Sequence, residues 1–181
     1  MLACYAGARS WATTRLLTCP KLAYYRSRNF ERKAGYMTHT AKPIPLHCFP
    51  LTEATVLEFY EFLFAPWVKS LGLRDFKISP GKASALLPQN DALKFSSGAV
   101  CGQAIMAAVD TVASLAMSTT ERISKGTVYQ HTHFLRPAVN DDFHVTTEVL
   151  RFGKATAFAE TRVSFVTSGE LVAHASLEFA F

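Results

Sequence analysis

The chain lacks the residue spacings that mark disulfide-stabilised and zinc-binding proteins. It has only four cysteines, and none is paired in a motif such as C-x-x-C. This argues against both a disulfide framework and a zinc site. The six histidines do not form a ligand set either: His131 and His133 alternate along a predicted strand, and we interpret them as two partly exposed strand residues. We therefore expect no metal and no cofactor. The cysteines are Cys4, Cys19, Cys48 and Cys101.

A long apolar run is also missing. A membrane-spanning helix needs about 20 consecutive apolar residues. The longest candidate, residues 97–117, is rich in alanine and contains the polar residues Gln103, Asp110, Thr111 and Ser114. We expect no membrane span.

Acidic residues are almost absent from the first 44 positions, where eight basic residues stand against Glu31 alone. The other positions carry 11 basic and 13 acidic residues, so the net charge of +5 comes from the N-terminal segment. The nearly neutral remainder does not indicate a nucleic-acid partner.

The N-terminal segment is rich in arginine and in hydroxyl residues, including Ser10, Thr13 and Thr18. This composition is typical of an organellar transit peptide. We predict a mitochondrial transit peptide over residues 1–40. A disordered basic tail, or sequence upstream of a start at Met37, fits the same composition and would leave a cytoplasmic protein.

The rest of the chain has the length and composition of one globular domain. Of the 181 residues of the whole chain, 49% are hydrophobic and 18% charged. Residues 41–50 contain three prolines and predict an extended linker, so the domain is expected over residues 51–181.

The expected helices and strands define the fold class of this domain. Thr52 is predicted to cap a helix that ends before Pro66. A second, long helix is expected over residues 102–119, and strands over residues 82–87, 127–135, 143–152, 155–166 and 170–181. This order predicts an α+β fold in which an antiparallel sheet wraps one face of the central helix.

Asp110 lies inside the long apolar helix, about two turns from its start. A carboxylate is rarely buried without a partner, because losing its hydration is costly. Asp110 therefore either faces a polar edge, such as a subunit seam, or takes part in chemistry.

Several weak motifs in a fixed order resemble a known family over residues 75–181. They are GAVCG at 98–102, AAVDT at 107–111, THFLRPA at 132–138, a GK turn at 153–154 and LVAHA at 171–175. Together they resemble the PaaI-type branch of the hotdog-fold acyl-CoA thioesterases. The resemblance implies a sheet wrapped around the long helix, subunits that join their sheets edge to edge as a homodimer or homotetramer, and active sites between subunits.

The resemblance also implies roles for individual residues. Asp110 matches the catalytic carboxylate, acting as general base or nucleophile. Gly102 matches the helix-opening glycine whose backbone N–H binds the thioester oxygen, and Thr127 matches a hydroxyl that orients water. Free N–H groups at a helix start suit a developing oxyanion. Gly102 of one chain is expected to face Asp110 of the other.

Three positions depart from the pattern of many relatives. Cys101 replaces a histidine, Gln103 a second glycine, and Phe95 an asparagine. Cys101 is a small packing residue or, as an alternative, a nucleophile, although no base lies near it in sequence. Gln103 either hydrogen-bonds the thioester oxygen or water, or is an ordinary polar residue at a helix start.

Basic and apolar side chains suggest where the substrate binds. Arg136, Arg151 and Lys154 flank the turns where family members hold the phosphates of CoA, although each also fits a solvated strand end. An apolar lining favours a fatty or aromatic acyl group. The lining is predicted from Phe95, Ile105, Met106 and Val109.

The sequence thus predicts an acyl-CoA thioesterase, which hydrolyses an acyl-CoA to the free acid and CoA. A second hypothesis is a non-catalytic hotdog subunit that binds acyl-CoA or scaffolds a partner, because Phe95 and Cys101 depart from the usual polar set. A hotdog hydratase or dehydratase is disfavoured, because those enzymes pair an aspartate with a histidine and no histidine lies near Asp110 in the helix.

Overall fold

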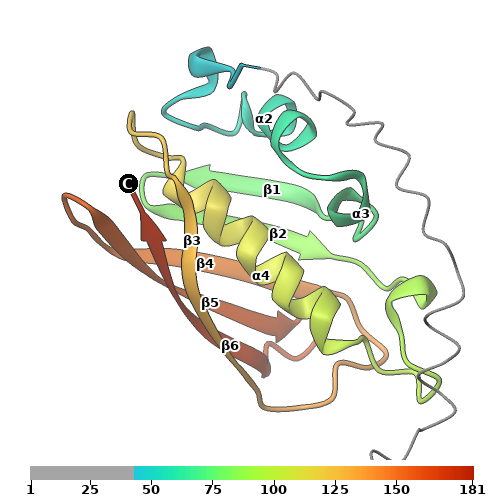
Figure 1. Cartoon of the computed structure of the whole chain (residues 1–181). Helices are drawn as coiled ribbons and strands as arrows, with labels where there is room; N and C mark the ends of the chain where they lie inside the picture. The colour runs from blue at the N-terminus through green and yellow to red at the C-terminus, as the bar shows by residue number, and fades with distance from the viewer. Residues whose placement is uncertain (1–42) are drawn as a thin grey trace, which may run out of the picture. The chain divides into compact units, whose positions relative to one another are not determined.

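A six-stranded antiparallel sheet wraps around one long helix, α4, in the computed structural model, which describes residues 43–181 (Figure 1). The strand order is β1-β2-β4-β5-β6-β3, so β1 and β3 are the two edges. This confirms the predicted α+β architecture. The elements are η1 (Leu46–Cys48), α2 (Val56–Leu63), α3 (Pro66–Lys69), β1 (Arg74–Ser79), β2 (Lys82–Leu87), η2 (Asp91–Leu93), α4 (Gly102–Met117), β3 (Gly126–Phe134), β4 (Phe143–Phe152), β5 (Thr156–Phe165) and β6 (Leu171–Ala180).

Helix α4 forms because its sequence combines strong helix formers with small side chains. Alanine has the highest helix propensity and lets the strands approach closely. Ala108, Val112 and Leu115 are fully buried against the sheet. The helix begins at the predicted residue and ends at Met117, two residues earlier than expected, with Ser118 as its C-cap.

The strands agree with the predicted ranges to within one residue, with one exception. β1 was not predicted, because Arg74, Asp75 and Lys77 interrupt its apolar pattern. Charged side chains of this kind are a common feature of edge strands, where they oppose pairing with another chain. β1 is such an edge, paired only with β2.

The segment before α2 packs onto the domain instead of remaining an extended linker. Cys48 in η1 is fully buried and Leu51 is 3% exposed. The Leu51 N–H also donates to the carbonyl of Ser118, just past α4. Thr52 does not directly precede α2, since its carbonyl closes a turn and the helix begins at Val56.

The sequence also predicted a transit peptide and the absence of a membrane span. The transit peptide predicted over residues 1–40 lies outside the described residues. Among the helices within residues 43–181, none is long and apolar enough to cross a membrane.

Tyr60 in α2 carries a hydroxyl that should reduce the stability of the domain. The ring packs against Phe64 and Phe76, with centroid distances of 5.3 and 5.0 Å. The buried hydroxyl has no hydrogen-bond partner within residues 43–181, and burial, followed by the charge of Glu61, raises the pKa of this group. An unsatisfied buried donor costs about 1–3 kcal/mol. We therefore expect Tyr60→Phe to raise the free energy of unfolding in urea by about 1 kcal/mol. A fall in stability would mean that the hydroxyl has a partner.

Candidate active site

Asp110 and Thr127 form a hydrogen-bonded pair where α4 meets the start of β3. The Thr127 hydroxyl donates to Oδ1 of Asp110 over 2.5 Å. Asp110 is partly exposed, about two turns from the start of α4, as its position in the sequence predicted. A carboxylate held in this way keeps its second oxygen free to accept a proton from water.

A β-bulge directs the Thr127 side chain towards α4. Thr127 lies opposite the buried Phe179, whereas Tyr129 lies opposite Glu178, with a register shift between them. Regular alternation would place residues 127 and 129 on the same face. β3 begins at Gly126, whose φ of +120° is a conformation that side-chain-bearing residues rarely adopt. The bulge and this glycine together bring the hydroxyl to Asp110.

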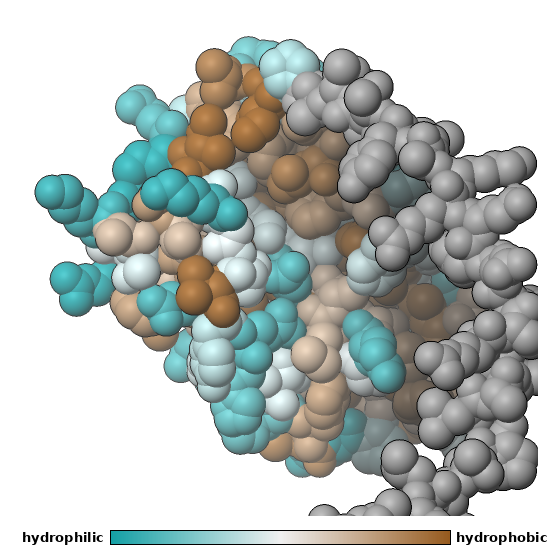
Figure 2. Space-filling view, in the orientation of Figure 1, coloured by the Kyte–Doolittle hydropathy of each residue, from teal (hydrophilic) through white to brown (hydrophobic). Residues whose placement is uncertain are grey.

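An apolar cavity of about 350 Å³ opens beside this pair. Part of its lining comes from the segment leading into α2 and from α2 itself, where apolar side chains also gather on the surface of the domain (Figure 2). The polar lining residues are Asp110, Ser114, Ser118, Ser124, Lys125 and Thr127. The apolar lining residues include Ile44, Phe49, Phe59, Leu63, Phe64, Ile123 and Phe179.

The lining predicted from the sequence differs from the one observed. Val109 is fully buried in the core, because it faces the sheet, and so does not line a cavity. Met106 is exposed but lines neither cavity described in this section. The wall from residues 44–64 was missed, since only the folded chain brings it next to Asp110.

Gly102 is the first residue of α4 and lies about two turns before Asp110. Its N-cap residue, Cys101, makes no side-chain hydrogen bond to the first turn. The amides of Ala104 and Ile105 donate to the Cys101 carbonyl, which leaves the amides of Gly102 and Gln103 for an external acceptor. A Cβ added at Gly102 would lie 3.1 Å from Cζ of Phe134. Glycine therefore permits a closer approach of the β3 end to the helix start than any other residue.

A second cavity, of about 420 Å³, lies against Gly102. Phe95, Ile105 and Arg136, all predicted substrate contacts, line it. Phe95 is held there by a tight turn, in which its N–H donates to the carbonyl of Ala99. The structure thus brings Phe95 and Arg136 to Gly102, residues that lie up to 41 positions apart.

Cys101 and Gln103 flank Gly102 at the helix start. Cys101 is partly buried, and its N–H donates to the carbonyl of Leu93. Gln103 is exposed. Neither side chain appears among the lining residues of the two cavities, so their proposed contacts with substrate remain predictions.

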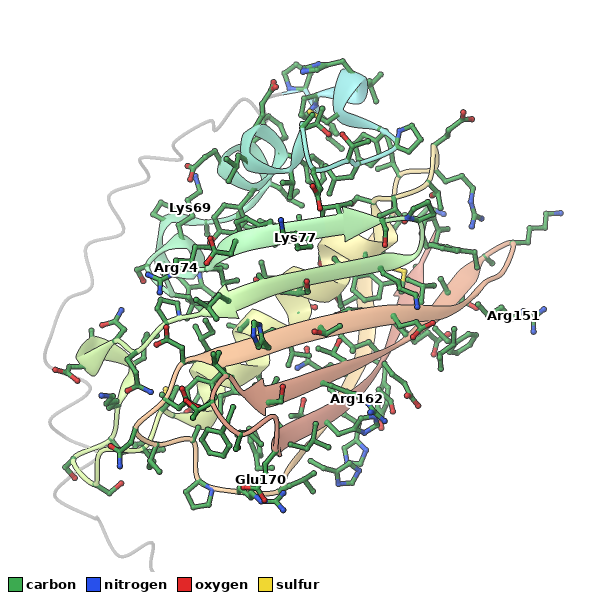
Figure 3. All side chains as sticks on the ribbon, turned by 180° about the vertical axis from the view of Figure 1, so that it is seen from behind. Lys69, Arg74, Lys77, Arg151, Arg162 and Glu170 are labelled. Carbon is green, nitrogen blue, oxygen red and sulfur yellow. The ribbon has the colours of Figure 1, made fainter. Side chains whose placement is uncertain are left out.

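The three basic residues predicted to bind phosphate do not lie together. Arg136 donates to the carbonyl of Leu171 and lies 3.5 Å from Glu170. Figure 3 shows Arg151 pointing into solvent near the β4–β5 turn, at the end of the sheet opposite Glu170. Lys154 lies in that same turn and is exposed. Within one chain, only Arg136 is close to Gly102.

Within one chain, Gly102 and Asp110 are too far apart to act on the same atom. They are eight residues apart on one helix, which corresponds to about 12 Å along its axis. They also line different cavities.

Strand β3, which carries Thr127 and Phe134, is a sheet edge with large exposed side chains: Val128, Tyr129 and Phe134 are 50–61% exposed. His131 and His133 share its outward face, as predicted.

Comparison with known proteins identifies the domain. Residues 98–175 match the family model of the thioesterase superfamily. This range includes Gly102, Asp110, Thr127 and Arg136 and excludes the α2 wall of the first cavity. A search of curated protein sequences returns no match.

Solved structures share the fold at low sequence identity. Thioesterase superfamily member 2 of zebrafish has a TM-score of 0.66 at 23% identity, covering 72% of this chain and 98% of its own. The PaaI protein from the phenylacetic acid degradation operon of Escherichia coli has a TM-score of 0.63 at 19% identity, covering 70% and 90%. A conserved protein of Pseudomonas aeruginosa has a TM-score of 0.61 at 24% identity, covering 66% and 96%. The chain therefore carries a thioesterase superfamily domain with the hotdog fold, as its motifs indicated.

Proposed function

We propose that this protein is an acyl-CoA thioesterase. The observation that carries the proposal is the Thr127–Asp110 hydrogen bond in the lining of a largely apolar cavity. It supports a role for the Asp110 carboxylate in attack on the thioester of an acyl chain bound in that cavity. A thioester is already activated, so its hydrolysis needs a positioned water, a base and an oxyanion site.

In this reaction Asp110 removes a proton from water, and the water oxygen bonds to the carbonyl carbon. The carbonyl oxygen becomes an oxyanion, which the amide of Gly102 stabilises. Collapse of this intermediate breaks the carbon–sulfur bond, and the CoA thiolate takes up a proton. Asp110 acting as the nucleophile, through an anhydride that water then opens, uses the same geometry. Either route yields the free acid and CoA.

The proposed site is completed by a second chain. The separation of Gly102 and Asp110 along α4 supports this, as does the exposed β3 edge. Pairing β3 with its copy about a twofold axis would reverse one helix against the other. Asp110 of each chain would then face Gly102 of its partner. The homodimer, or a homotetramer built from it, is part of the proposal.

Arg136 is the residue best placed to hold the phosphates of CoA, because it lines the Gly102 cavity. Arg151 and Lys154 are secondary candidates, which a partner chain would have to bring close.

The mitochondrial address predicted for residues 1–40 is also retained as a proposal. It rests on the basic and hydroxyl-rich sequence alone.

The cavity beside Asp110 should select the length of the acyl chain. Leu63 lines it and is 43% exposed, so a larger side chain there fits without disturbing the core. Leu63→Trp should lower kcat/KM for long-chain acyl-CoAs by about tenfold or more, because pocket contacts of a few methylene groups are worth this much. Acetyl-CoA should be affected little. The measurement is kcat/KM over a series of saturated acyl-CoAs.

Leu57→Trp is the matched control. Leu57 lies on the same helix, is 63% exposed and does not line the cavity. It should leave the chain-length profile unchanged. Equal losses for short and long chains in Leu63→Trp, or the same profile in both variants, would contradict the assignment of this cavity to the acyl chain.

The proposed activity is tested by thiol release from a panel of fatty and aromatic acyl-CoAs. We expect saturable turnover of at least one of them by the full chain. Saturable binding of acyl-CoA without turnover would overturn the proposal in favour of a binding or scaffolding subunit. Addition of water to an enoyl-CoA without release of thiol would favour a hydratase.

A further inference from the structure

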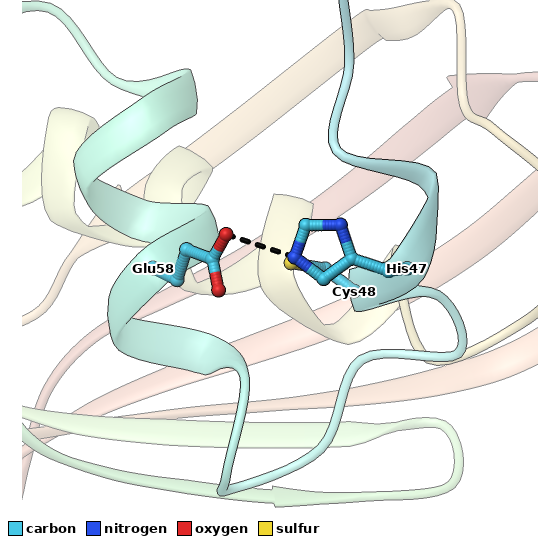
Figure 4. A group of neighbouring side chains, drawn as sticks. All are labelled: His47, Cys48 and Glu58. Carbon is cyan, nitrogen blue, oxygen red and sulfur yellow. Dashed lines mark hydrogen bonds and ion pairs between the residues drawn. The ribbon is translucent and has the colours of Figure 1, made fainter.

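A group of three metal-binding side chains lies outside the proposed active site. His47 and Cys48 come from η1 and Glu58 comes from α2, and they point toward one another (Figure 4). Nε2 of His47 lies 2.8 Å from Oε1 of Glu58. One ligand atom from each residue, including Sγ of Cys48, lies within 4.8 Å of the others. We propose that these residues bind a zinc ion that joins η1 to α2.

The donor set fits a thiophilic divalent cation. Zinc takes imidazole nitrogen, thiolate sulfur and carboxylate oxygen at about 2.0–2.3 Å, so its tetrahedral ligands lie about 3.4–3.6 Å apart. Nε2 of His47 and Oε1 of Glu58, now 2.8 Å apart, would have to separate slightly, and no two of the three ligand atoms are more than 4.8 Å apart. Neutral imidazole, thiolate and carboxylate together carry two negative charges, which match the charge of the ion. Calcium and magnesium prefer oxygen ligands alone and should bind poorly.

The surroundings leave room for the fourth ligand. The side chains of His47 and Glu58 are 65% and 59% exposed, whereas Cys48 is fully buried beneath them. Water can therefore complete the coordination from outside, with the sulfur below. Burial, and then the charge of Glu58, raise the pKa of the Cys48 thiol. Zinc binding would displace the thiol proton.

The proposed ion would fix the wall of the apolar cavity. Phe49 follows Cys48 and Phe59 follows Glu58, and their rings meet edge to face with centroids 5.2 Å apart. Both line the cavity beside Asp110. An exposed ion pair alone contributes little to stability, so the His47–Glu58 pair by itself holds η1 only weakly. The zinc site does not depend on the proposed thioesterase activity, since it lies on the outer side of this wall.

Cobalt(II) substitution tests the site spectroscopically on the full chain. We expect the near-ultraviolet charge-transfer band of a cobalt–thiolate bond and the visible bands of tetrahedral cobalt. The band should disappear in Cys48→Ser and remain in Cys101→Ser, Cys4→Ser and Cys19→Ser. A band that survives Cys48→Ser, or no band in the wild type, would overturn the proposal.

Two variants at exposed positions cover the case in which Cys48→Ser fails to fold. His47→Gln and Glu58→Gln should each weaken zinc binding, measured calorimetrically, by more than the roughly 10- to 100-fold that loss of an outer-shell partner costs. His131→Gln and Glu53→Gln are matched controls and should bind zinc like the wild type. Equal affinity in all of these proteins would mean adventitious binding and would also overturn the proposal.

Discussion

Replacing Asp110 by asparagine should lower kcat for acyl-CoA hydrolysis by about 10²- to 10⁴-fold, the usual contribution of a general base. The amide has nearly the same shape, and its oxygen can accept the Thr127 hydrogen bond that Oδ1 accepts in the native protein. It cannot take a proton from water or act as the nucleophile. The measurement is thiol release at saturating substrate, with circular dichroism and the oligomeric state as checks on folding.

Asp75→Asn provides the matched control for this change. Asp75 is on β1, at the edge of the sheet opposite β3, and its side chain is 70% exposed. Its φ of +56° is one that asparagine tolerates well. We expect wild-type activity from Asp75→Asn. If Asp110→Asn were equally active, Asp110 would be neither base nor nucleophile.

Gly102→Val should lower kcat by about 10²- to 10³-fold, the usual cost of losing one oxyanion donor. The added Cβ would lie 3.1 Å from the Phe134 ring. That ring is half exposed and can rotate, so the variant should fold. The valine and the displaced ring should then cover the first-turn amide that we propose as the donor to the thioester oxygen. Unchanged kcat in Gly102→Val would show that the oxygen binds elsewhere.

Most of the fold follows from local sequence patterns. The alanine-rich pattern of α4 and the alternating strands β2, β4, β5 and β6 are strong, because each of these elements has one face in a common core. β1 could not be predicted in this way, since Arg74, Asp75 and Lys77 reflect its position at an edge. An edge position is set by topology and leaves little periodic signal.

For the candidate site, too, the sequence indicated some residues but not the contacts that depend on the folded chain. The resemblance assigned Asp110, Gly102 and Thr127, but the contact between Asp110 and Thr127 depends on the bulge after Thr127, which regular alternation does not reveal. The cavity wall comes from residues 44–64, which lie outside the matched family range. The His47–Glu58 contact likewise joins residues 11 positions apart through the packing of η1 on α2.

We propose that each active site combines Asp110 of one chain with Gly102 of another. It is tested by mixing Asp110→Asn and Gly102→Val proteins that carry different tags, under conditions in which subunits exchange. Half of the resulting dimers are mixed, and each mixed dimer contains one site with both native residues. We expect recovery to about a quarter of the wild-type activity, as a twofold-symmetric site requires. If mixed dimers form, as the tags would show, and the mixture stays as inactive as its components, Asp110 and Gly102 of different chains do not share a site.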